Sequence, residues 1–203
     1  MEAAAEQAGH VRPSSWRRLV RTLGLARSHV GLLTLKLIGA LWPPNALLVA
    51  RHGASLVRSG APAADGASIE PSIDDALGWL LRSQDRVGSG GVGCYEFYRW
   101  TAGYPEVTGY IIPTLWDCSH QLGREELGDR AVRMADWELG IQRREGGFEG
   151  GYEGDGEPAV VFNTGQVIRG LLRTAEETGE GRYLDAAVRA GEWIVANQDE
   201  DGS

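Results

Sequence analysis

Acidic and aromatic residues crowd one stretch of this sequence, between positions 95 and 116. Its carboxylates, Glu96 and Glu106, are the candidate catalytic residues, because a pair of carboxylates can supply a general acid and a base or nucleophile to a glycan. The candidate substrate-binding residues are Tyr95, Tyr98, Trp100, Tyr104, Tyr110 and Trp116, joined farther along the chain by Asn163 and Gln166. Aromatic faces stack on sugar rings, and they also stabilise the carbocations of terpene chemistry. These residue types therefore favour a glycan or an isoprenoid substrate.

Glu106 has two interpretations. It lies just before Thr108-Gly109, at a predicted helix start. There it is either a functional carboxylate or a charge that the helix dipole stabilises.

A second acidic group, in the loop after position 148, consists of Glu149, Glu153, Asp155 and Glu157. Its members lack a fixed ligand spacing, so we expect a solvated loop, and we predict neither a metal nor a cofactor.

A repeat positions these residues. A Thr-Gly pair recurs 56 residues on (164 − 108), and a Trp-x4-Gln motif recurs at the same distance. The copies are Thr108-Gly109 and Thr164-Gly165, then Trp137/Gln142 and Trp193/Gln198, with a less regular Trp79/Gln84 before them. Such a period indicates stacked helical hairpins. The predicted fold is all-α, with helices over 72–84, 108–122, 125–142, 164–177 and 182–198.

Local signals define some helix ends. Ser72 is a suitable N-cap for the first helix of the repeat region. Pro113 is expected in the early turns of its helix, where a missing N–H costs least, and Gly123 closes that helix. In the next helix, the predicted apolar positions are Leu127, Val132, Ala135 and Leu139.

Charge divides the chain of 203 residues into an arm and a body. Residues 1–60 carry eight basic and two acidic residues, whereas the remainder carries 12 and 26. We therefore predict a basic N-terminal arm over 1–70, with helical segments and a linker, and a repeat body over 71–203. The net charge of −8 argues against nucleic acid as a partner. Two cysteines, Cys94 and Cys118, do not make a disulfide framework at this length.

The arm has an amphipathic segment over residues 16–41. Its apolar side chains fall near one face and its arginines mostly off it, so a helix there can make peripheral contact with an anionic membrane surface. A packing helix or a weakly structured arm is the alternative. No stretch reaches the roughly 18 apolar residues of a membrane span, and the start is not a standard signal peptide. The expected location is cytoplasmic.

The Trp-x4-Gln copies, with glycines after them, resemble the glutamine–aromatic repeats of the α/α toroid in squalene–hopene cyclases and protein prenyltransferases. The resemblance covers residues 72–203. It implies that each glutamine ties an inner helix end to a neighbouring loop, and that loops at one end of the inner helices surround a cavity holding the candidate residues. A hairpin array needs neighbours on both sides, and the last copy does not look like a cap. We therefore expect an incomplete toroid, truncated at its C-terminus.

Residues 104–114 (YPEVTGYIIPT) and 161–166 (VFNTGQ) are similar to bacterial toroid proteins associated with exopolysaccharide biosynthesis. Six-hairpin glycosidases and uronic-acid-processing enzymes share this architecture. The resemblance implies a protein that processes or binds a polysaccharide, with uronic-acid glycans among the candidates. The alternatives are a terpenoid cyclase or prenyltransferase-type enzyme acting on an isoprenoid, and a non-catalytic glycan-binding or scaffold subunit. Whether the chain is an enzyme stays open.

The isoprenoid alternatives lack their motifs. The closest match to the cyclase acid motif Asp-x-Asp-Asp is Ser72-Ile-Asp-Asp75, which lacks the first Asp and is explained as a helix start. Prenyltransferases bind zinc through Asp, Cys and His, and Asp117-Cys118-Ser119-His120 has these residue types. On a helix, however, Cys118 and His120 point to different faces, so no zinc site is predicted.

Overall fold

The structure, a computed structural model, describes residues 69–96 and 99–201. The chain divides into two compact units, residues 1–69 with 96–99 and residues 70–95 with 100–203, and the second contains the repeats. The predicted basic arm, its amphipathic helix with the membrane contact, and its linker lie outside the described residues.

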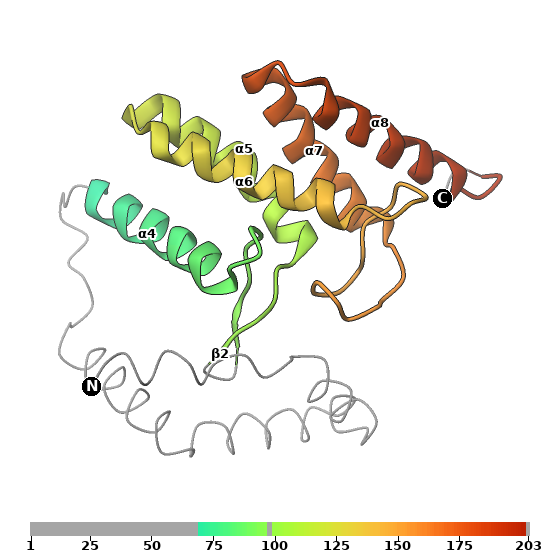
Figure 1. Cartoon of the computed structure of the whole chain (residues 1–203), viewed down its shortest axis with the longest axis horizontal. Coiled ribbons are helices and arrows are strands. Elements are labelled where there is room, and N and C mark those ends of the chain that lie inside the picture. Colours follow the sequence, from blue (N-terminus) through green and yellow to red (C-terminus); the bar gives the residue numbers. More distant parts are fainter. Residues whose placement is uncertain (1–68, 97–98, 202–203) are drawn as a thin grey trace, which may run out of the picture. The chain divides into compact units, whose positions relative to one another are not determined.

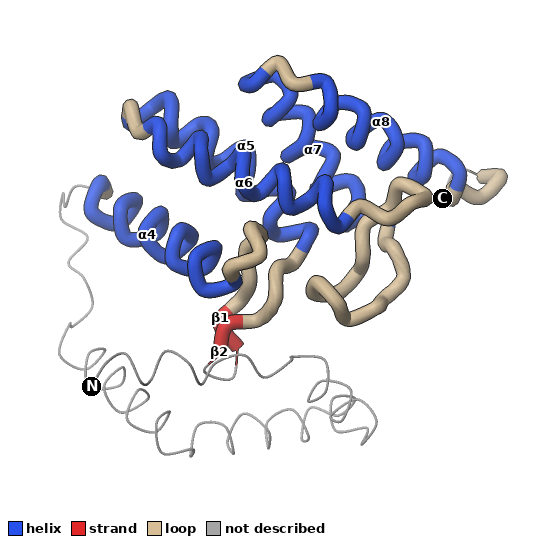
Figure 2. The backbone as a smooth tube through the Cα atoms, in the orientation of Figure 1, coloured by secondary structure: helices blue, strands red, loops and turns tan. Residues whose placement is uncertain are grey.

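The described part is helical except for a ribbon of two short strands, which confirms the all-α prediction (Figures 1 and 2). The elements are α4 (Glu70–Val87), β1 (Tyr95–Glu96), β2 (Arg99–Trp100), α5 (Pro105–Leu122), α6 (Glu125–Ile141), α7 (Val161–Thr178) and α8 (Gly181–Ala196). None of these helices combines the length and apolar character that crossing a bilayer requires.

Two local predictions were wrong. Since α4 begins at Glu70, Ser72 lies inside its first turn and is not the N-cap. Pro113 lies in the interior of α5, because that helix already starts at Pro105. Its missing N–H leaves the carbonyl of Gly109 without its helical donor. Gly123 does close α5, with a left-handed φ of 64° and an N–H that bonds Ser119 O.

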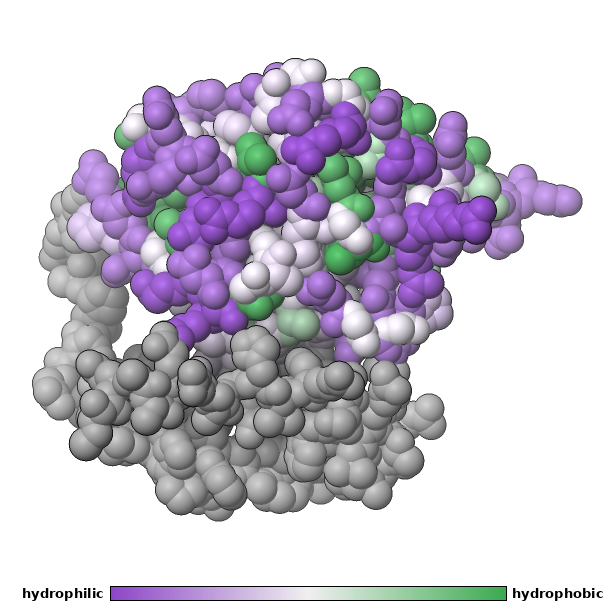
Figure 3. Space-filling view, in the orientation of Figure 1, coloured by the Kyte–Doolittle hydropathy of each residue, from purple (hydrophilic) through white to green (hydrophobic). Residues whose placement is uncertain are grey.

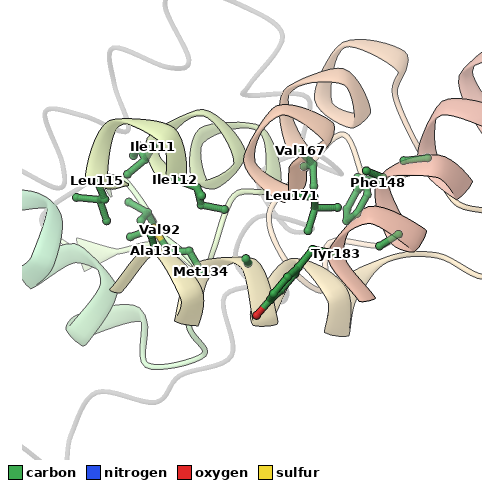
Figure 4. Close-up of a cluster of buried hydrophobic side chains, with 14 of the residues drawn as sticks. Val92, Ile111, Ile112, Leu115, Ala131, Met134, Phe148, Val167, Leu171 and Tyr183 are labelled. Atoms are coloured by element: carbon green, nitrogen blue, oxygen red, sulfur yellow. The ribbon is translucent and has the colours of Figure 1, made fainter. Parts of the chain in front are cut away.

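Two hairpins stack side by side: α5 packs against α6 and α7, and α7 packs against α8. The buried positions of the first hairpin recur 56 residues later in the second. The equivalent pairs include Val92/Phe148, Ile111/Val167, Leu115/Leu171, Leu127/Tyr183, Ala131/Ala187 and Met134/Ala190 (Figure 4). Each copy therefore contributes an equivalent layer to one continuous core.

Glycines bring α5 and α7 into backbone contact. A Cβ built on Gly170 would lie 2.5 Å from the carbonyl oxygen of Gly109. A Cβ on Gly109 would lie 2.7 Å from Gln166 O and from the Cα of Val167. The carbonyl that Pro113 deprives of a donor therefore faces α7 directly, and only glycine fits on either side.

Glutamine amides connect each helix end to the loop after it. Gln84 Nε2 donates to Gly90 O at 2.9 Å and to Arg130 O at 3.2 Å. Gln142 repeats this with Gly146 O at 3.0 Å and Ala186 O at 2.9 Å. The glutamine thus lies at the end of the second helix of a hairpin and joins it to a loop and to the next copy.

Glycines in the same loops make room for the repeat tryptophans. Cβ atoms on Gly91 and Gly103 would lie 2.8 Å and 2.5 Å from the Trp137 ring. Gly147 approaches the Trp193 ring in the same way, with 2.7 Å to a built Cβ. The Trp-Gly contact is therefore a structural part of the repeat.

We predict that Gly109→Ala destabilises the protein by about 1–3 kcal/mol, because the added methyl group forces α5 and α7 apart. Urea unfolding measures the change. Gly140→Ala is the matched control, since Gly140 is in α6 with no atom within 4 Å of a built Cβ. That variant should gain up to about 1 kcal/mol from helix propensity. Equal effects of the two substitutions would contradict the close contact.

Candidate functional site

The loop that leads into α5 and the loop between α6 and α7 bring a pair of tyrosines together. The Tyr104 and Tyr152 ring centroids are 5.0 Å apart, at an interplanar angle of 46°. Beside them, Glu153 N donates to Gly103 O at 2.8 Å. Tyr104 O accepts from the N–H of Thr108, and the Thr108 hydroxyl accepts from Val92 N at 2.9 Å. Backbone bonds therefore hold the ring pair in place.

Glu106 lies in the first turn of α5, between Tyr104 and Tyr110 in the chain. Burial raises the pKa of the Tyr110 hydroxyl, and the nearby charge of Glu106 raises it further, with smaller contributions from Cys94 and Tyr104. Tyr110 is nevertheless 38% exposed. One carboxylate and two phenols are thus neighbours at the start of this helix.

A second aromatic group forms around Trp100. Its ring lies 5.4 Å from that of Trp79 and 5.3 Å from that of Tyr95. Trp79 and Tyr95 are 42% and 45% exposed. Trp79 therefore differs from Trp137, which is buried, and this agrees with the less regular spacing of the first copy.

Three predicted binding residues make structural contacts. Asn163 is buried and donates from Nδ2 to Glu149 O at 3.1 Å. Gln166 accepts from Arg169 through its side-chain oxygen at 2.9 Å. Trp116 packs on Gly128 and donates from Nε1 to Thr174 Oγ1 at 3.4 Å. It also lies about 18 Å farther along α5 than Tyr104, at 1.5 Å per residue, so the structure does not bring it to the tyrosine pair.

The predicted pair of Glu96 and Glu106 stays a prediction. Glu96 belongs to β1, and its side chain, like the whole of Tyr98, lies outside the described residues.

Two carboxylates of the acidic loop accept hydrogen bonds from the backbone of the same loop. Glu149 Oε1 accepts from Glu157 N at 2.6 Å, and Asp155 Oδ2 accepts from Tyr152 N at 3.2 Å. Within residues 69–96 and 99–201, no group of three or more His, Cys, Asp or Glu side chains could hold a metal ion. Two members of this loop therefore have a structural role.

Comparisons with protein-family models, curated proteins and solved structures find no match to the chain. The repeats themselves therefore provide the comparison. Positions 96, 104 and 106 of the first copy correspond to 152, 160 and 162 of the second. The residues at these three positions change from Glu, Tyr and Glu to Tyr, Val and Phe.

The sequence prediction missed Tyr152, which completes the ring pair. The signal that could have identified it is the divergence between the copies. The buried hydrophobic positions of the two hairpins stay apolar between copies, whereas positions 96, 104 and 106 around the ring pair change chemical type.

Glu138 was also missed, although two of the four apolar positions predicted for α6, Leu127 and Ala135, are buried. Val132 and Leu139 are only half-buried, whereas Ala131, Met134 and Glu138 are fully buried. Among the described residues, neither carboxylate oxygen of Glu138 has a hydrogen-bond partner. Burial raises the pKa of this carboxyl well above its ordinary value. Its equivalent in the second copy is Ile194, so an acid occupies an apolar position.

We predict that ionisation of Glu138 lowers the free energy of unfolding, by an amount that grows as the pH rises. Because its folded-state pKa is raised, the unfolded state releases the proton first, and stability falls as pH rises from about 4 toward the folded pKa. The slope approaches about 1.4 kcal/mol per pH unit. Glu138→Gln should remove this loss, so the variant should exceed the parent in stability at pH 7 but not at pH 4.

Urea unfolding at several pH values tests this expectation. Glu192→Gln is the control, since that carboxylate is exposed on α8 and its removal should leave the pH profile nearly parallel to that of the parent. A constant difference between parent and Glu138→Gln across the pH range would show that Glu138 does not titrate as described.

Proposed function

We propose that this chain binds a polysaccharide at the surface formed by Tyr104, Tyr152 and Glu106. The observation that carries the proposal is the ring pair. Two tyrosines from different loops lie 5.0 Å apart, and hydrogen bonds of the adjacent backbone hold both loops. Tilted, partly exposed rings offer apolar faces to a sugar ring, and their hydroxyls can bond the sugar hydroxyls.

Glu106 is the carboxylate that we assign to this surface. It lies one turn before Tyr110 in the first turn of α5, and its charge helps to raise the pKa of that tyrosine, which supports the assignment. A carboxylate accepts strong hydrogen bonds from sugar hydroxyls. It is also the described group that we propose for proton transfer in a processing reaction.

The charge of the surface favours some sugars over others. Glu106 follows one ring of the pair, and Glu153 is adjacent to the other ring in the sequence. Like charges repel, so uronate carboxylates should bind less well than neutral or amino sugars. Of the polysaccharides that the resemblance suggests, we therefore propose the neutral or amino-sugar class.

We further propose that the stacked hairpins belong to an α/α toroid. The recurring core, the glutamine bonds and the parallel packing of α5 on α7 support this architecture. The isoprenoid alternative has less support, because its candidate acid and zinc residues have other partners. Asp74 accepts from Arg124 at 3.2 Å, and Asp117 accepts from Arg173 at 2.8 Å.

Calorimetric binding to neutral, amino-sugar and uronate oligosaccharides tests the proposal, with farnesyl diphosphate as the isoprenoid probe. Tyr152→Ala should weaken saccharide binding about tenfold, or about 1.4 kcal/mol. Tyr152→Phe should restore most of the affinity, because the ring is kept. Tightest binding to farnesyl diphosphate, with no saccharide signal, would overturn the glycan assignment in favour of the isoprenoid alternative.

Glu106→Gln separates binding from processing. If the variant still binds the saccharide but no longer forms the product of its processing, proton transfer is assigned to Glu106. If only the affinity for the saccharide falls, Glu106 has a binding role. Glu176→Gln is the control, because that exposed carboxylate belongs to the other end of α7 and should leave both quantities unchanged. Equal effects of the two substitutions would show that the signal reflects net charge.

A further inference from the structure

The second hairpin has an apolar face that the described residues do not cover. Its exposed large hydrophobic residues are Val160, Val161, Phe162, Leu172, Leu184, Val188 and Val195. Phe162 is 60% exposed and Val195 is 68% exposed. Hydrophobic side chains interrupt the hydrophilic surface over α8 (Figure 3). A contiguous apolar face would mark an interaction surface, and the repeat indicates which of these residues form one.

Repeat equivalence shows what this face is built to contact. Trp116 of the first hairpin packs against α7, and its equivalent in the second is the exposed Leu172. Leu139 packs against the core, and its equivalent is the exposed Val195. Trp116 thus contacts the neighbouring copy, whereas its equivalent in the second hairpin is exposed.

Gly165 is the most specific of these positions. Its equivalent, Gly109, is a glycine because α7 passes at backbone distance, with 2.7 Å from a built Cβ to Gln166 O. Around Gly165, no atom lies within 4 Å of a built Cβ. The second copy therefore has the same close-packing glycine, without a helix against it.

We propose that this face binds a further α/α hairpin of the same repeat, whose first helix places a glycine against Gly165. The interface would continue the one that α5 already makes with α7. In that interface Gly170 is the partner glycine, and a Cβ there would lie 2.5 Å from Gly109 O. The incoming helix must meet the same requirement.

This requirement excludes a second copy of the chain docking through α5. The position of α5 equivalent to Gly170 is Thr114. A threonine Cβ cannot approach a helix backbone at the distance that Gly170 reaches, and its branched side chain adds further bulk. The face therefore fits a hairpin with glycine at this position.

The test extends the chain after Ser203 by a copy of its own residues 148–203, which keeps the 56-residue register and supplies Gly170 opposite Gly165. Amide hydrogen exchange in α7 should slow at least tenfold relative to the original chain. Unchanged exchange in α7 would overturn the proposal.

We expect Gly165→Ala to shift the unfolding midpoint in opposite directions in the original and the extended chain. In the original chain, it should raise the unfolding midpoint by about 2–4 °C through helix propensity. In the extended chain, it should lower the midpoint and remove the added protection of α7. Gly140→Ala, the control, should raise the midpoint in both. An increase for Gly165→Ala in both chains would overturn the proposal.

Analytical ultracentrifugation of the original chain adds an independent outcome. A concentration-dependent dimer that Gly165→Ala abolishes would show that a second copy occupies the face, and would overturn the assignment of a hairpin with glycine. A monomer across the concentration range supports it.

Discussion

The hydrogen bonds of one glutamine side chain determine how each copy of the repeat connects to the next. An amide has two N–H donors and an acceptor oxygen. Gln142 donates to the loop after its own helix and to α8, while its oxygen accepts from Arg189 at 2.6 Å. Gln84 uses the same three kinds of partner, with Arg130 as its donor. Because a buried polar group must be satisfied, the amide fixes the helix end, the loop and the neighbouring copy together. The hairpins therefore cannot slide past one another without leaving these groups unpaired.

A second constraint acts on the loops that follow these helix ends. It is the contact between tryptophan rings and glycines. Trp137 lies against Gly90, Gly91 and Gly103, so the loop before α5 is held at both of its ends. The start of the loop before α7, at Gly146 and Gly147, lies against Trp193. The segments between these anchors are free to differ in sequence without changing the frame, as is usual where function resides on loops of a rigid scaffold. Tyr104 directly follows the contact of Gly103 with Trp137, and Tyr152 follows the contact of Gly147 with Trp193, which connects the packing of the repeat to the proposed binding surface.

The periodic part of this fold could be predicted from the sequence, because helices, the period and the Trp-x4-Gln motif are local patterns. The errors occur where tertiary contacts override local rules. Pro113 lies inside α5 although it leaves the Gly109 carbonyl without its helical donor, and the close approach of Gly170 to that carbonyl is a contact that no local rule anticipates. Glu138 was not among the predicted core positions, and an unpaired acid is not expected in a core because its burial costs free energy. The candidate site stays a prediction, in which Glu106 and Tyr110 are one turn apart on α5 and Tyr104 directly precedes that helix. Tyr152 comes from the other copy, and a contact between copies depends on how the hairpins stack.

Differences between equivalent positions distinguish structural from special residues within this one chain. Gly109 and Gly165 both place glycine inside a helix, which costs about 1 kcal/mol relative to alanine. At Gly109 the backbone contact with α7 explains that cost, and at Gly165 the proposed further hairpin would explain it. Glu138 poses the opposite case, because its equivalent Ile194 shows that the fold accepts an apolar side chain there. Folding alone therefore does not require an acid at position 138. Where folding of the repeat does not require a residue type, as at Gly165 and Glu138, a partner, a ligand or a reaction is the explanation to test.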